Sequence, residues 1–113
     1  MTVVETPLFL RKAGKMLDDE ERSALIFAIG ETPDAGEIIP ETGGVRKLRW
    51  ALKGKGKSGG ARVIYYFQSE RMPVLLLSIY AKNDKVNLSK AERNELKKLI
   101  PEFVREYLKG RRS

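Results

Sequence analysis

The sequence predicts an α+β fold in which helices flank a small antiparallel sheet. Apolar residues recur at helical spacing near both ends of the chain, whereas three segments rich in β-branched and aromatic residues follow one another between them. Because no helical pattern separates these three segments, we expect them to pair as antiparallel neighbours with the helices packed against them. The chain of 113 residues contains no repeat and no linker, so a single domain is expected over residues 1–113.

The N-terminal part is predicted to hold a short strand and two helices. Residues 2–6 are β-branched and form a candidate strand. Thr6 can cap a helix that begins at Pro7, because proline is favoured at the first helical position. Asp18 can cap a second helix with an acidic first turn, and Gly30 can end that helix.

The rest of the chain is predicted to hold a loop, three strands and one or two helices. Residues 31–44 are rich in turn residues and are predicted to be a loop. Strands are expected at residues 45–52, 62–68 and 74–80. Ser89-Lys-Ala-Glu92 matches a capping box and predicts a helix directly after it. Pro101 is expected to start a further helix.

The chain contains neither histidine nor cysteine, and this excludes several kinds of site. Serine-histidine and cysteine-histidine nucleophiles are excluded, as are imidazole and thiolate metal ligands, although a carboxylate site for a hard cation remains possible. Proton transfer near neutral pH would fall to Lys, Tyr, Asp or Glu. With no disulfide, no long apolar run and no secretory-signal pattern, the sequence favours a cytoplasmic protein without a membrane span.

Positive charge is concentrated in the second part of the chain. Residues 1–45 carry 4 basic and 9 acidic side chains, although the whole chain has a net charge of +7. No acidic residue lies between Glu41 and Glu70. Seven basic residues lie there: Arg46, Lys47, Arg49, Lys53, Lys55, Lys57 and Arg62. Such a block indicates a site for a polyanion, most often a nucleic acid, and is favoured over a merely soluble basic surface.

The segment 52–62 contains two apparent nucleotide-binding motifs. Residues 54–59 satisfy G-x-G-x-x-G, and residues 56–58 resemble the end of a P-loop. Both motifs require a following helix, whereas a strand is predicted here, so both interpretations are disfavoured. A glycine-rich loop whose backbone and lysines contact phosphates remains, with a solvated hairpin loop as the alternative.

Two neighbouring predicted strands bring cations together. Lys47 and Arg49 are two residues apart and so project from one face, and Arg62 lies near them if the strands form a hairpin. Because cations on one sheet face repel each other, this cluster is more readily explained by a bound phosphate. Aromatic residues interleave with the charge, and for each a place in the core is favoured over stacking on bases: Trp50, Tyr65, Tyr66, Phe67 and Tyr80.

Three segments, residues 42–50 (TGGVRKLRW), 56–66 (GKSGGARVIYY) and 79–83 (IYAKN), resemble the RelE/HigB branch of the RelE/ParE toxin superfamily. The predicted order of elements is similar across nearly the whole chain. The resemblance implies a microbial-RNase-like fold, a small antiparallel sheet flanked by helices. It also implies a toxin that enters the ribosomal A site and cleaves messenger RNA. An antitoxin protein, expected to be of the helix-turn-helix type, would neutralise it.

The resemblance also implies roles for particular residues. In such toxins two basic residues before the glycine loop and an arginine after it handle the scissile phosphate, which implies Lys47, Arg49 and Arg62 here. A further catalytic basic residue follows the last strand, where Lys82 matches best and Lys85 is the alternative. Some members carry a tyrosine shortly afterwards, which residues 83–89 lack, so Tyr80 is a possible substitute. The expected RNA-binding residues are Arg46, Lys53, Lys55, Lys57, Tyr80 and Lys85.

RNA cleavage without metal or cofactor uses the ribose 2′-hydroxyl as the nucleophile. Arginine stays protonated and therefore acts as a phosphate clamp, which suits Arg49 and Arg62. A lysine crowded by other cations gives up its proton more easily, so Lys47 is the candidate for proton transfer, with Lys82 nearby and Lys57 as a helper. Two alternatives remain: a non-catalytic nucleic-acid-binding module, and a ParE-like inhibitor of DNA gyrase.

Overall fold

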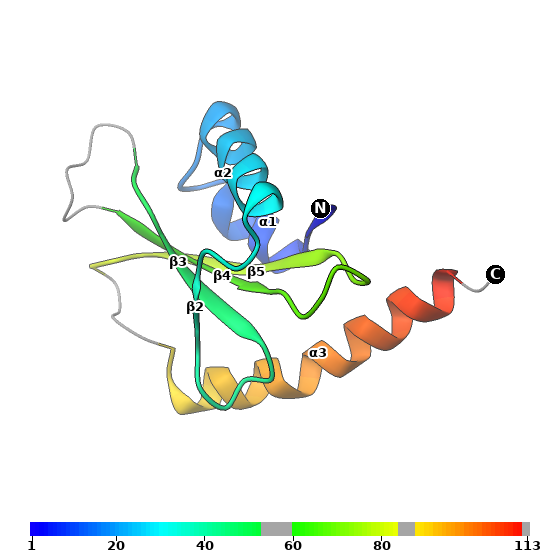
Figure 1. Cartoon of the computed structure of the whole chain (residues 1–113). Helices are drawn as coiled ribbons and strands as arrows, with labels where there is room; N and C mark the ends of the chain where they lie inside the picture. Colours follow the sequence, from blue (N-terminus) through cyan, green and yellow to red (C-terminus); the bar gives the residue numbers. More distant parts are fainter. Residues whose placement is uncertain (53–59, 84–87, 112–113) are drawn as a thin grey trace.

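The computed structural model describes residues 1–52, 60–83 and 88–111. These residues form an α+β fold, as the sequence predicted (Figure 1). In chain order the elements are β1 (Val3–Glu5), α1 (Pro7–Ala13), α2 (Asp19–Glu31), β2 (Glu37–Ile38), β3 (Val45–Trp50), β4 (Ala61–Tyr66), β5 (Val74–Ala81) and α3 (Lys90–Arg111).

The five strands form one sheet in the order β1-β5-β4-β3-β2. The predicted pairing of the three central strands is confirmed, because β3 pairs with β4 and β4 with β5, both antiparallel. The edge strand β1 instead lies parallel to β5, with Val3 beside Val74. The antiparallel prediction is therefore right for every pair except this one, in which two helices and three strands separate the partners along the chain.

The N-terminal helices begin where their caps predicted. The Thr6 side chain accepts a hydrogen bond from the Phe9 N–H at 3.3 Å, and Asp18 forms a reciprocal capping box with Glu21. The expected helix end at Gly30 is wrong, because α2 continues through Glu31. Gly30 is explained by close packing, since a Cβ there would lie 3.1 Å from the carbonyl oxygen of Met1.

The predicted loop 31–44 contains the short strand β2, so the loop prediction was wrong at this point. Glu37 pairs with Lys47 and Ile38 with Arg46. A strand of two residues has no alternation to detect in the sequence. Its place is set by contacts with β3, among them a hydrogen bond of 2.8 Å from the Ile39 N–H to the Val45 carbonyl.

The C-terminal segment forms one helix, α3, and the second helix expected to start at Pro101 is not a separate element. Its predicted capping box is confirmed, because the Ser89 N–H donates to Glu92 at 2.9 Å and the Glu92 N–H donates to Ser89 at 3.1 Å. Pro101 lies inside α3 and does not start a new helix. Proline removes one backbone donor from a helix, but here the helix continues on both sides of it.

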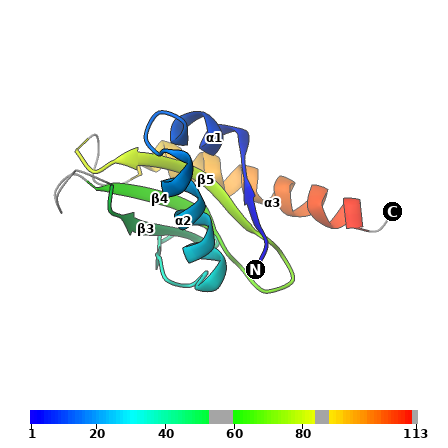
Figure 2. The same ribbon diagram turned by 90° about the horizontal axis from the view of Figure 1, so that it is seen from above.

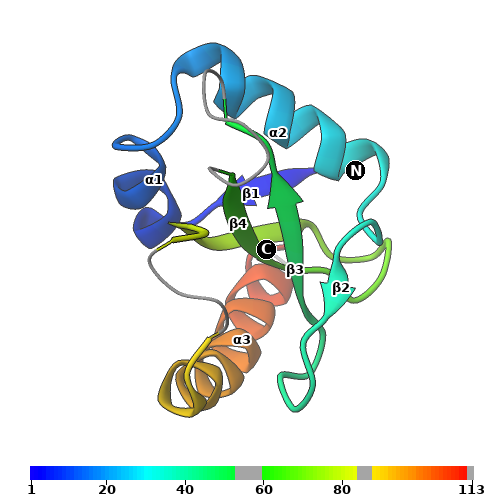
Figure 3. The same ribbon diagram turned by 90° about the vertical axis from the view of Figure 1, so that its left-hand side faces the viewer.

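Helices cover the two faces of the sheet, with α1 and α2 on one face and α3 on the other (Figures 2 and 3). Beneath α1 and α2 the core includes Phe9, Leu25, Ile29, Val63, Tyr65 and Leu76. Beneath α3 the core includes Val45, Ile64, Tyr66, Leu75, Leu77 and Ile100. The C-terminal half of α3 extends past the sheet (Figure 1).

Candidate functional site

The alternation of β3 and β4 places three basic side chains on the α3 face of the sheet. Lys47 lies directly opposite Ile64, which belongs to the core on that face, and Arg49 lies directly opposite Arg62. On its other side Arg62 pairs with Tyr80 of β5. The predicted hairpin therefore brings together Lys47, Arg49 and Arg62, with Tyr80 beside them.

These cations surround a pocket of about 310 Å³. Its lining residues are Ala35, Glu37, Lys47, Leu48, Arg49 and Arg62. Arg49 is exposed, whereas Lys47 and Arg62 are half-buried. We call this space the cationic pocket. A surface with three converging cations suits an anion with several oxygen atoms, such as a phosphate group.

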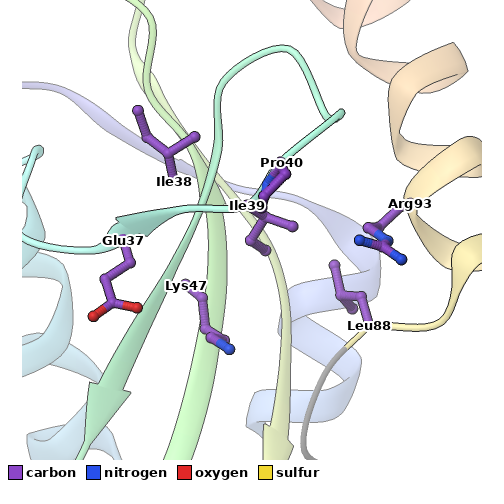
Figure 4. A pocket seen from close by; sticks show the side chains of 7 residues that line it. All are labelled: Glu37, Ile38, Ile39, Pro40, Lys47, Leu88 and Arg93. Carbon is purple, nitrogen blue, oxygen red and sulfur yellow. The ribbon is translucent and has the colours of Figure 1, made fainter.

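A second pocket, shown in Figure 4, has a volume of about 330 Å³ and shares two lining residues with the first. Its lining residues are Glu37, Ile38, Ile39, Pro40, Lys47, Leu88 and Arg93. We call this space the mixed pocket, because it has an apolar wall and charged residues at its edges. Glu37 and Lys47 line both pockets and so form the wall that the two share.

Sequence reasoning missed two charged residues of this site, Glu37 and Arg93. Glu37 lay in a predicted loop, and only the pairing of β2 with β3 brings it beside Lys47. Arg93 lies in the first turns of α3, and nothing in the sequence shows that this turn faces the sheet near Ile39. The pattern around Glu37 offered one weak signal, the apolar pair Ile38-Ile39 between turn residues.

Arg46 is not brought together with the other cations. It lies one residue from Lys47 on the same strand, and its guanidinium donates hydrogen bonds to the carbonyl oxygens of Asp34 at 3.1 Å and Gly36 at 2.8 Å. The guanidinium also lies 6.0 Å from the centre of the Phe67 ring. Arg46 thus holds the segment before β2 in place, although the sequence suggested it as an RNA contact.

Lys82 also lies apart from the two pockets. It is exposed just beyond β5, where its backbone N–H donates to the Gly60 carbonyl at 2.9 Å. The pocket that it lines, of about 270 Å³, includes Lys15 and Met16 from the α1 side. The remaining predicted RNA contacts, Lys53, Lys55, Lys57 and Lys85, lie outside the described residues.

Tyr80 is buried next to Arg62, with only 5% of its surface exposed. Burial raises the pKa of the Tyr80 phenol above its usual value of 10.0; Arg62 lowers this pKa and Glu92 raises it. The phenol is therefore protonated at neutral pH and can donate a hydrogen bond. The core interpretation is confirmed for Tyr65, Tyr66 and Tyr80, which are all buried.

The described residues contain neither a metal-binding cluster of acidic side chains nor a helix that could span a membrane. Within residues 1–52, 60–83 and 88–111, no three acidic side chains lie close enough together to hold a metal ion. Among the described helices, none has an apolar stretch long enough to cross a membrane.

A comparison with protein families supports the interpretation of the fold. The family model for the "RelE toxin of RelE / RelB toxin-antitoxin system" matches residues 1–108, which is nearly the whole chain. The matched region includes every strand of the sheet and both pockets. The chain belongs to the RelE toxin family and is thus the toxin of a toxin–antitoxin pair, with an antitoxin as its partner.

Proposed function

We propose that this toxin cleaves messenger RNA on the ribosome by metal-free attack of a ribose 2′-hydroxyl on the adjacent phosphorus. The observation that carries the proposal is the convergence of Lys47, Arg49 and Arg62 on one pocket. Membership of the family supports it, because RelE-type toxins are generally endoribonucleases. The resemblance of the three sequence segments to the RelE/HigB branch favours the same reaction.

The register of the hairpin adds a physical argument. Arg49 and Arg62 are directly opposed on β3 and β4, and like charges in such positions destabilise a sheet. A phosphate bound between them would turn this repulsion into attraction. Each guanidinium can hold two phosphate oxygens at once, and the attraction grows as charge builds up on the phosphorane.

The residues would then divide the work as follows. Arg49 and Arg62 hold the phosphate oxygens, and Lys47, whose ammonium can give up a proton, takes part in proton transfer. The buried Tyr80 phenol stays protonated beside Arg62 and supports that side of the pocket. Lys82, exposed at the end of β5, would contact the RNA backbone outside the cationic pocket.

In this proposal the ribosome positions the RNA, which so small a site cannot do alone. Lysine and arginine are weak proton-transfer groups, so the reaction depends on holding the 2′-hydroxyl and the phosphate in line. The partners in this proposal are therefore the ribosome, its messenger RNA and an antitoxin of the helix-turn-helix type. The place of action would be the cytoplasm, where ribosomes translate.

The test compares purified variants on ribosomes that carry a defined messenger RNA. Arg62→Ala and Lys47→Ala are expected to lose cleavage by on the order of a hundredfold or more while still binding the ribosome. Lys109→Ala removes a charge from an exposed position on α3, away from both pockets, and should cleave at the wild-type rate.

The two alternative functions would give different results. A non-catalytic binding module would show no cleavage by the wild type, and its binding would weaken gradually with each lost cation. A gyrase inhibitor would block DNA supercoiling without cutting RNA. Wild-type rates of cleavage in both Arg62→Ala and Lys47→Ala would show that the proposed site is wrong.

A further inference from the structure

An acidic residue of the edge strand lines the cationic pocket. Glu37 of β2 pairs directly with Lys47 of β3, so their side chains leave the same face of the sheet. In Figure 4 the two side chains leave neighbouring strands, and their charged ends point in different directions. Among the described residues that line the two pockets, Glu37 is the one acid.

A carboxylate in this position works against the binding of a phosphate. It brings a negative charge to the wall of the pocket that Arg49 and Arg62 make positive. A cross-strand ion pair with Lys47 would add little stability at so exposed a position. A chemical role for Glu37 accounts for its place better than a structural one.

The reaction proposed above needs a group that accepts the proton of the 2′-hydroxyl. A carboxylate is already deprotonated at neutral pH, whereas a lysine ammonium must first lose its own proton and arginine does not lose it at all. The chain contains no histidine. Among the described lining residues, Glu37 is thus the one whose side chain can accept a proton without a prior step.

A nucleoside in the mixed pocket with its 3′-phosphate in the cationic pocket would bring the 2′-oxygen near the wall that contains Glu37. Ile39, Pro40 and Leu88 give the mixed pocket an apolar wall suited to a nucleoside, and its volume of about 330 Å³ is typical of a small-ligand site. The cationic pocket suits the phosphate. The 2′-oxygen lies between a nucleoside and its 3′-phosphate, so it falls at the wall that Glu37 and Lys47 share.

We propose that Glu37 is the catalytic base that accepts the proton of the 2′-hydroxyl, while the Lys47 ammonium donates a proton to the leaving oxygen. This inference rests on the proposed RNA cleavage. The 2′-oxygen forms a bond to phosphorus, the bond from phosphorus to the 5′-oxygen breaks, and its electron pair goes to that oxygen. The products are a 2′,3′-cyclic phosphate and a 5′-hydroxyl end.

The diverging side chains of Glu37 and Lys47 suit this division of roles. Attack and departure occur in line on opposite sides of the phosphorus, so the base and the acid must reach it from different directions. After the reaction Glu37 is protonated and Lys47 is neutral. Exchange with solvent water restores both before the next turnover.

The first test uses Glu37→Gln, which keeps the shape of the side chain and removes its charge. Single-turnover cleavage on the ribosome should fall by about a hundredfold to ten-thousandfold, while ribosome binding is unchanged or tighter. Glu41→Gln makes the same change at an exposed position that lines neither pocket, and should cleave normally.

A modified substrate separates the base from the acid. An RNA with sulfur in place of the 5′-oxygen at the cleaved bond has a leaving group that needs no proton. This substrate should restore cleavage by Lys47→Ala and should not restore cleavage by Glu37→Gln. Restoration of both variants would overturn the assignment of Glu37 as the base.

The remaining outcomes distinguish this inference from the proposed function. If the wild type cleaves RNA and Glu37→Gln cleaves equally fast, Glu37 is not the base, although the toxin is still a ribonuclease. If the wild type cleaves nothing, the proposed function itself fails. Should Glu37→Gln melt below the assay temperature, Glu37→Asp, which keeps the carboxylate, must cleave faster than Glu37→Ala, and equal rates for these two variants would count against the inference.

Discussion

Replacing Tyr65 with phenylalanine tests how the segment before β2 is held in place. The ring of Tyr65 is fully buried beneath α1 and α2. Its hydroxyl donates to the Pro33 carbonyl at 2.7 Å and accepts from the Gly36 N–H at 2.8 Å. Gly36 directly precedes Glu37, so this one hydroxyl anchors, from the α1 and α2 side of the sheet, the segment that leads to the wall shared by the two pockets.

The magnitude follows from the partners that Tyr65→Phe leaves behind. The Gly36 N–H is buried and would lose its partner, whereas the Pro33 carbonyl is only partly buried and can turn to water. An unsatisfied buried donor costs about 1–3 kcal/mol in the free energy of unfolding. For a domain of this size that amounts to a fall in melting temperature on the order of 5 °C for each kcal/mol.

The same substitution should change how stability depends on pH. Burial raises the pKa of Tyr65 above 10.0; the Gly36 hydrogen bond and Arg46 lower it, and Asp34 raises it. Because the folded pKa is the higher one, the phenol's contribution is complete below pH 10 and is lost as pH rises through the folded pKa. Tyr65→Phe should therefore lose less stability than the wild type in strong alkali.

Thermal melts at neutral and alkaline pH would check both the loss of stability and its changed dependence on pH. Tyr66→Phe is the matched control. The Tyr66 hydroxyl bonds to the exposed side chain of Gln68 at 2.9 Å, so water can replace it there and the cost at neutral pH should be smaller. A Tyr65→Phe protein that melts at the wild-type temperature at pH 7 would refute the anchoring role. Cleavage should fall along with stability if the anchor positions Glu37.

Four further substitutions or conditions follow from the structure. Lys47→Arg should not restore the cleavage lost in Lys47→Ala, because arginine keeps its proton; wild-type rates in a ribosome assay would contradict this. Thr42→Val should lower the free energy of unfolding by about 1–2 kcal/mol in urea titrations, because the buried hydroxyl donates to the Ile39 carbonyl at 2.6 Å and accepts from the Val45 N–H at 3.2 Å. Pro101→Ala should raise the melting temperature, because it restores an N–H and removes a residue that costs a helix interior about 3 kcal/mol; an unchanged melt would mean that the helix already accommodates the proline. The complex with the antitoxin should weaken as salt rises in binding measurements, and an affinity independent of salt would argue against contact with the cationic pocket.

The elements that the sequence predicted correctly are those specified by neighbouring residues. The caps at Thr6, Asp18 and Ser89 act within one turn of helix, and the structure contains all three. The hairpin of β3 and β4 follows from two adjacent strand patterns. The strand β2 and the parallel partner of β1 depend on contacts with distant segments, which no local pattern encodes.

In the site, too, the residues grouped by local alternation were predicted, whereas those brought in by distant segments were not. Alternation along β3 was enough to group Lys47 with Arg49, and the same alternation puts Arg46 on the opposite face, although the sequence suggested it as an RNA contact. Glu37 and Arg93 reach the site from β2 and α3. Their positions depend on how those elements pack against the sheet, and the sequence alone does not specify that packing.

The parallel pairing of β1 with β5 has a consequence for how the chain folds during synthesis. The Thr6 hydroxyl donates to the Leu76 carbonyl at 2.7 Å, across 70 residues of chain. Closing so long a loop is slow, because its entropy must be lost before the contact is gained. Strand β1 leaves the ribosome before β5 and must therefore wait for it, so this edge of the sheet stays incomplete until β5 has been synthesised.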